Sequence, residues 1–122
     1  MKGLHILAEL HDCQAGTALL HEVEAVRKVC VTACADAGLT GVAEAFHGFP
    51  NGGATGVVVL AESHLAVHTW PEISAVTLDI YVCNYSQDNR AAAEAAFAAL
   101  SAAFLPARVV RRDIRRGDVG AA

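Results

Sequence analysis

The chain has 122 residues, 54% of them apolar, and a formal charge of −4 at neutral pH. A chain of this length forms one domain that buries roughly two-thirds of the surface of its unfolded form, so it needs no disulfide or metal to fold. Because it lacks an 18-residue apolar run, a secretory leader pattern and a coherent basic surface, we expect a cytoplasmic protein with neither a membrane nor a nucleic acid as partner.

Hydrophobic periodicity predicts six strands and two helices. In chain order these are a strand at 3–10, a helix at 18–37, strands at 42–49, 55–61, 65–70 and 76–82, a helix at 88–104 and a strand at 107–114. Gly38 and Pro106 are expected to end the two helices. This order is typical of the α+β class, here a two-layer α/β sandwich whose antiparallel or mixed sheet carries two helices on one face.

Two helices on one face leave the other face of the sheet uncovered. Alternating Val and Ile residues predict that a second subunit covers this face, so we expect a homodimer. In the last strand, Arg111, Asp113 and Arg115 share one face, which we expect to be solvated.

The cysteines are expected to be free thiols, because they show no C-x-x-C spacing and lie at 13, 30, 34 and 83. Cys30 and Cys34 are four apart on a predicted helix and are expected to pack as small apolar groups.

The most informative segment is AESHLAVHTWPE at 61–72. Its Ser63 and His68 are five residues apart, so on a straight strand they point to opposite faces and cooperate only if the backbone bends. Attack of the Ser63 hydroxyl on the carbonyl of Glu62 would convert the peptide into an ester. Such a step is helped by backbone strain and needs donors for the oxyanion.

This segment resembles the self-cleavage motif of the prokaryotic, short S-adenosylmethionine decarboxylase proenzymes. The similarity covers most of the chain and includes the Phe46-His47-Gly48-Phe49 segment and Cys83. It implies cleavage between Glu62 and Ser63 into a β chain, 1–62, and an α chain, 63–122, in which Ser63 becomes a pyruvoyl group. It further implies that this cofactor forms a Schiff base with S-adenosylmethionine and supports its decarboxylation to the aminopropyl donor for spermidine biosynthesis.

The resemblance also implies roles in processing and proton transfer. His68 would assist self-cleavage, together with the hydroxyl of Thr55, which stands where the family usually has a serine. Cys83 would return a proton to the substrate, a role suited to a thiol, since thiols are ordinarily protonated at neutral pH.

Substrate contacts follow from the same resemblance. Phe49 would stack on the adenine of the small-molecule substrate, and Glu72 would bind the ribose hydroxyls. The sulfonium cation would be stabilised by an aromatic face, for which Phe46 is a further candidate.

The chain departs from the usual family pattern near these expected contacts, at Gly48, Ile73, Ser74, Ala75 and Asn84. The departures spare the cofactor-forming residues but leave the substrate open, so a pyruvoyl-dependent decarboxylase of ornithine or arginine is an alternative. An uncleaved domain that binds a ligand or partner is a further alternative.

Two other kinds of site are not expected. His64 and His68 would bind a metal together on a helix, but a strand is predicted here, so no metal site is expected. A nucleophile pair of Cys83 and His68 would lack the third residue that orients such pairs.

Overall fold

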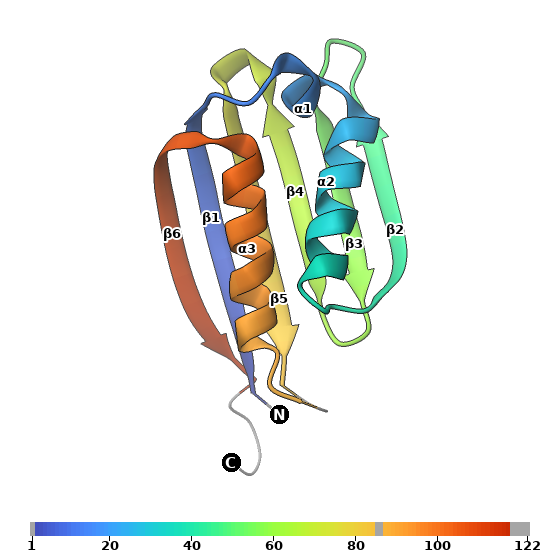
Figure 1. Ribbon diagram of the computed structural model, residues 1–122, viewed down its shortest axis with the longest axis vertical. Coiled ribbons are helices and arrows are strands. Elements are labelled where there is room, and N and C mark those ends of the chain that lie inside the picture. Colours follow the sequence, from blue (N-terminus) through green and yellow to red (C-terminus); the bar gives the residue numbers. More distant parts are fainter. Residues whose placement is uncertain (1, 85–86, 118–122) are drawn as a thin grey trace.

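Six strands form one sheet and three helices cover one of its faces in the computed structural model, which describes residues 2–84 and 87–117 (Figure 1). In chain order the elements are β1 (Gly3–Cys13), α1 (Thr17–His21), α2 (Val23–Asp36), β2 (Gly41–Gly48), β3 (Ala54–Leu60), β4 (His64–Trp70), the 3-10 turn η1 (Pro71–Ile73), β5 (Ala75–Cys83), α3 (Arg90–Phe104) and β6 (Pro106–Arg116). The predicted boundaries agree with these within three residues, apart from the first helix.

The sheet has the strand order β2-β3-β4-β5-β1-β6, and every neighbouring pair is antiparallel. The predicted α+β sandwich is therefore confirmed, with an antiparallel sheet. Its helices lie together on one side (Figure 1). The other side of the sheet, called here the open face, carries none of the helices in the described part of the chain. No helix among the described residues has both the length and the apolar character needed to span a bilayer.

The predicted helix at 18–37 is wrong in one respect, because Glu22 interrupts it with an extended backbone at φ −96° and ψ 119°. The reason lies in the tertiary structure. The carbonyl of His21 accepts a hydrogen bond from the Gly53 amide at 3.0 Å, and the carbonyl of Leu20 accepts one from the Thr69 hydroxyl at 2.8 Å. Since these carbonyls accept hydrogen bonds from the β2–β3 turn and from β4, the first helix ends and a second begins.

The core lies between the sheet and the helices. Because strand side chains alternate, Ile6 and Leu10 of β1 face the helices together with Ile80 of β5, and all three are fully buried. Leu100 and Phe104 of α3 cover them from the other layer and are also fully buried. The residues that alternate with these along the same strands therefore lie on the open face.

All four cysteines are buried and free, as expected from their spacing. Burial raises the pKa of Cys30 to about 12 and that of Cys34 to about 11, so both stay protonated at neutral pH. They contribute to the core as apolar groups.

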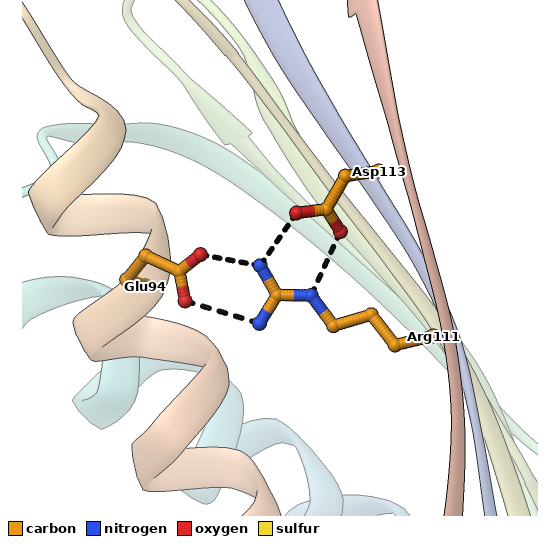
Figure 2. A network of polar contacts seen from close by, with 3 residues as sticks. All are labelled: Glu94, Arg111 and Asp113. Atoms are coloured by element: carbon orange, nitrogen blue, oxygen red, sulfur yellow. Dashed lines mark hydrogen bonds and ion pairs between the residues drawn. The ribbon is translucent and has the colours of Figure 1, made fainter.

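Arg111 joins the edge strand β6 to α3 and does not extend into solvent as predicted (Figure 2). Its guanidinium forms a bidentate pair with Glu94 of α3 and hydrogen bonds of 2.8 and 2.9 Å with Asp113. It also lies over the Phe97 ring, 4.8 Å from the centroid. Because α3 is rich in alanine, it leaves room for this long side chain, which is 24% exposed.

We expect Arg111→Met to lower the free energy of unfolding by up to about 1 kcal/mol at pH 7, as is usual for partly exposed ion pairs. Hydrogen bonding to Arg111 lowers the pKa of Asp113, so this carboxylate stabilises the fold above its ordinary pKa near 3.9, and the contribution is lost as pH falls below that value. The difference between the variant and the native chain should therefore disappear towards pH 3. Urea unfolding at both pH values measures it.

Arg108→Met is the matched control, because Arg108 is an exposed arginine on the opposite face of β6. It should change the free energy of unfolding little at either pH. An equal loss for Arg111→Met at pH 7 and pH 3 would mean that packing on Phe97, and not the carboxylates, supplies the stabilisation.

Candidate active site

Ser63 lies at the end of a two-residue turn between β3 and β4. Leu60 and Ser63 exchange backbone hydrogen bonds of 2.9 and 3.4 Å around Ala61 and Glu62, and the amide of Ala61 donates to the carbonyl of Thr40 at 2.9 Å. These bonds hold the Glu62–Ser63 peptide at the tip of the hairpin, where both side chains are half-buried.

The structure does not bring Ser63 and His68 together within the chain. The strand β4 is continuous from His64 to Trp70 and pairs with both β3 and β5 along its length, so the bend that cooperation requires is absent. At 3.2–3.4 Å per residue, Ser63 and His68 lie about 16 Å apart. Ser63 lies at the β3–β4 turn, and His68 pairs with Thr55 next to the β2–β3 turn. These two turns lie at opposite ends of the sheet (Figure 1).

Cys83 lies at the same end as Ser63. His64 pairs with Tyr81, and continuing this register by one position places Ser63 opposite Val82 and next to the end of β5. The Asn89 side-chain amide donates to the Cys83 carbonyl at 2.9 Å and to the Glu62 carboxylate at 3.3 Å. The hydrogen-bonded group of Glu62, Cys83 and Asn89 therefore holds the β3–β4 turn against the end of β5.

Asn89 was missed in the sequence analysis. It precedes α3, where an asparagine ordinarily caps the helix, but its side chain makes no capping hydrogen bond and reaches back to β5 and the turn. In the sequence, the one notable feature of Asn89 is its position before a helix. That position predicts a helix cap and not a contact with β5. Asn89 is 7% exposed, and a buried amide needs hydrogen-bond partners. The Cys83 carbonyl and the Glu62 carboxylate are those partners.

His68 and Thr55 form a pair at the other end of the sheet. They face each other across β3 and β4, and the Thr55 hydroxyl and His68 Nδ1 are 3.0 Å apart. Both line a cavity of about 340 Å³, which is also lined by Phe49, Trp70 and Glu72. The structure therefore brings together four of the residues expected to act in processing and substrate binding: Phe49, Thr55, His68 and Glu72.

The β2–β3 turn shapes this cavity. The amide of Phe49 donates to the Gly53 carbonyl at 3.0 Å, and Gly53 has a φ of +98°. A Cβ on Gly53 would lie 3.0 Å from the Pro71 ring and 3.1 Å from the Thr69 carbonyl. Glycine therefore permits the turn to pack closely against η1, which leaves Phe49 48% exposed at the cavity.

Phe46 does not reach this cavity. It pairs with Gly56 and lies across that glycine, where a Cβ would be 2.0 Å from Phe46 Cδ2. From there it packs against the buried core on the helix side of the sheet. Successive strand residues point to opposite faces, and Phe46 falls on the face towards the helices. It is therefore a packing residue in this structure.

Four of the departures from the family pattern, Gly48, Ile73, Ser74 and Ala75, lie next to the segments that line the cavity, whereas Asn84 follows β5 at the other end of the sheet. Ile73 is 65% exposed in η1, and Ser74 has a left-handed backbone with φ +50°. A Cβ on Gly48 would lie 3.0 Å from Val23 of α2, so a larger residue would displace that helix. These positions change the border of the cavity and leave the residues that line it in place.

The fold and these side chains define a small α+β domain whose candidate functional groups are divided between the two ends of one sheet. Residues 4–117 match the family model described as S-adenosylmethionine decarboxylase. The chain therefore belongs to the S-adenosylmethionine decarboxylase family, and the resemblance seen in the sequence is confirmed.

Individual proteins agree with this assignment. The chain is 37% identical to the S-adenosylmethionine decarboxylase proenzyme of Picrophilus torridus over 116 residues, which are 95% of this chain and 85% of the relative. It is 43% identical to the proenzyme of Acetivibrio thermocellus over 81 residues, 66% of this chain and 64% of that relative, so this match spans less than two-thirds of the relative. The crystal structure of the adenosylmethionine decarboxylase from Aquifex aeolicus is similar with a TM-score of 0.87 and 33% identity, covering 98% of this chain and 94% of that one.

Proposed function

We propose that this chain is a proenzyme that cleaves itself between Glu62 and Ser63 and then decarboxylates S-adenosylmethionine. The observation that carries the proposal is the position of Ser63 at a tight turn beside Cys83. The Ser63 oxygen would bond to the Glu62 carbonyl carbon as the peptide C–N bond breaks. Elimination would then release the Glu62 carboxylate, and one water would convert the remaining dehydroalanine into a pyruvoyl group and ammonia.

The residues around Ser63 fit such a group. A pyruvoyl group supplies a carbonyl that binds the substrate amine and accepts electrons as carbon dioxide leaves. Cys83 ends β5 one register position away, is 7% exposed, and would hold the proton that the substrate carbon receives. Asn89 would position Cys83 through its carbonyl. The proposed products are a β chain, 1–62, and an α chain, 63–122.

The site would be completed by a second copy of the chain. A separation of about 16 Å prevents His68 from reaching Ser63 of its own chain. In an isologous two-fold dimer the same face meets itself, so the Ser63 end of one sheet can lie against the His68 end of its partner. The open face carries exposed apolar side chains suited to this contact, with Leu7 36%, Val59 39% and Ile114 49% exposed.

Cavity sizes support the same arrangement. The cavity beside Ser63, Glu62 and Asn89 is about 90 Å³, whereas the cavity beside Phe49 and Glu72 is about 340 Å³. Pockets for small ligands generally exceed about 300 Å³, so of these two cavities the one beside Phe49 and Glu72 has room for a nucleoside and the one beside Ser63 does not. The reacting end of the substrate would lie beside Ser63 of one protomer, while its adenosine would occupy the cavity beside Phe49 and Glu72 of the other.

The lining of the larger cavity favours S-adenosylmethionine over ornithine or arginine. Phe49 offers an exposed aromatic face for adenine, and Glu72 offers a carboxylate for the ribose hydroxyls. Among the described residues Glu72 is the one acidic side chain that lines it, which is little for a dibasic amino acid. The product would be the aminopropyl donor for spermidine biosynthesis, and assays with all three substrates test the choice.

Replacing Phe49 should weaken substrate binding without affecting self-cleavage. Aromatic stacking on a base contributes about 1–3 kcal/mol, so we expect Phe49→Ala to raise the KM for S-adenosylmethionine roughly tenfold or more. Steady-state decarboxylation measures KM, and the intact mass of the same preparation measures cleavage.

Val42→Ala is a control with an exposed apolar side chain at the start of β2, outside the cavity, and it should leave KM unchanged. An unchanged KM for Phe49→Ala in a fully cleaved enzyme would show that adenine binds elsewhere.

A further inference from the structure

Three neighbouring strands place two histidines and one aspartate together on the open face. In the pairing of β4, β5 and β1, His64, Tyr81 and His5 form one row across the sheet. Asp79 lies two residues before Tyr81 on the central strand, so it is diagonal to both histidines and on the same face. This cluster is called here the His5–His64–Asp79 triad.

The ligand atoms of the triad converge. His5 Nε2 lies 2.8 Å and His64 Nε2 lies 3.1 Å from the same oxygen, Asp79 Oδ2. One nitrogen or oxygen from each residue lies within 4.8 Å of the others. The side chains are 16%, 36% and 28% exposed for His5, His64 and Asp79, so the triad is sheltered and still accessible to a small ion.

We propose that the His5–His64–Asp79 triad binds a divalent transition-metal ion such as zinc or cobalt. Two imidazoles and a carboxylate are ligands that zinc and its neighbours prefer, whereas magnesium and calcium prefer oxygen alone. Ligand atoms around tetrahedral zinc are about 3.3 Å apart for bonds near 2.05 Å, so small side-chain rotations suffice. Three protein ligands leave the fourth position for water or another ligand.

Tyr81 helps to hold the two imidazoles in place. Its ring centroid is 5.7 Å from that of His5 and 5.9 Å from that of His64, and it lies between them in the row. The two imidazole rings are themselves 5.9 Å apart in an edge arrangement. Contacts on both rings restrict their rotation, which reduces the entropy lost when a metal binds.

Arg116 opposes the metal. Its Nη1 lies 3.1 Å from His5 Nδ1, and a guanidinium only donates, so Nδ1 is the acceptor and the proton is on Nε2. Metal binding at Nε2 would move this proton to Nδ1 and displace Arg116. Because Arg116 is exposed at the end of β6, it is free to move, at the cost of its contact with the Tyr81 ring at 4.4 Å.

In the sequence, His64 and His68 are the pair whose spacing suggests a metal site, and the predicted strand argued against it. In the structure these two histidines have different hydrogen-bond partners: His68 pairs with Thr55, and His64 pairs with Asp79. The ligands of the proposed site are 15 to 74 positions apart in sequence, so no local motif marks them. The site uses neither the hydroxyl of Ser63 nor the substrate cavity, so metal binding can be tested apart from cleavage and decarboxylation. It does lie on the open face, and in the proposed dimer it would lie at the contact between the two copies.

The test is titration of the untagged, chelator-treated protein with Co²⁺, followed by visible absorption, with competition by Zn²⁺. The native chain should bind one Co²⁺ per chain with d–d absorption that Zn²⁺ abolishes. His64→Gln and Asp79→Asn should each weaken binding at least tenfold while retaining the native circular dichroism spectrum. Arg116→Gln should tighten binding, because it removes a competing cation.

His11→Gln is the matched control. His11 Nε2 pairs with Glu9 at 2.8 Å on the same strand as His5, but this pair has no third ligand among the described residues, so its loss should leave Co²⁺ binding unchanged. Absence of Co²⁺ uptake by the native chain would overturn the proposal. So would equal uptake by folded His64→Gln or Asp79→Asn variants, or weaker uptake by Arg116→Gln.

Discussion

The Ser63→Ala chain is expected to remain a single polypeptide of 122 residues, whereas the native chain is expected to separate into fragments 1–62 and 63–122. The variant lacks the hydroxyl oxygen that would bond to the Glu62 carbonyl, so no ester forms and no elimination follows. Because Ser63 is half-buried at the hairpin tip and Ala is smaller, the fold should be retained. Decarboxylation should fall to background, since no pyruvoyl group is made.

Intact mass under denaturing conditions measures this difference, and the C-terminal fragment should carry a pyruvoyl group with no free α-amine. Ser101→Ala is the control, because it removes a serine hydroxyl from α3, away from the turn, and should cleave like the native chain. A native chain that stays at full-length mass for days would contradict the proposed enzyme. The remaining interpretation would then be a domain that binds a ligand or a partner without cleavage.

Self-cleavage should be restored when two inactive chains share a dimer. His68→Ala alone should not cleave, because its Ser63 meets a partner that also lacks His68. Co-expression with Ser63→Ala gives mixed dimers in which the intact Ser63 of one chain meets the intact His68 of the other. The cleaved fraction of the His68→Ala chain should therefore rise from undetectable to the fraction of that chain present in mixed dimers. The Ser63→Ala chain should stay uncut.

Chains of different mass, made by adding a short tag to one of them, show which chain is cleaved. His11→Gln provides the control, because it removes a histidine from the open face outside the substrate cavity and should cleave alone. Cleavage of His68→Ala by itself would show that this histidine has no part in processing. A mixture without cleavage would show that Ser63 and His68 do not meet across two chains.

The contrast between the β3–β4 hairpin and the first helix shows which features local sequence determines. The apolar and β-branched residues along 55–61 and 65–70 predict both strands, because strand propensity depends on residues that are close along the chain. The helix at 18–37 has an equally good periodicity but is broken at Glu22. The carbonyls at that point bond to Gly53 and Thr69, which are distant in sequence, and no local pattern reveals those partners.

Sequence alone determined the α+β class, the strand and helix order and the motif at 61–72, because these depend on periodicity and on residues that are close along the chain. Tertiary structure alone decided which residues meet. Strand register puts Ser63 next to the end of β5, where Asn89 bonds to Cys83 and Glu62, and it puts His68 with Thr55 at the far end of the sheet.

The same register assembles His5, His64 and Asp79 from three strands. Register is set by long-range backbone hydrogen bonds and by burial of one face of the sheet, and a shift of one residue would reverse every side chain. Contacts between distant segments therefore become visible only when the strands are paired.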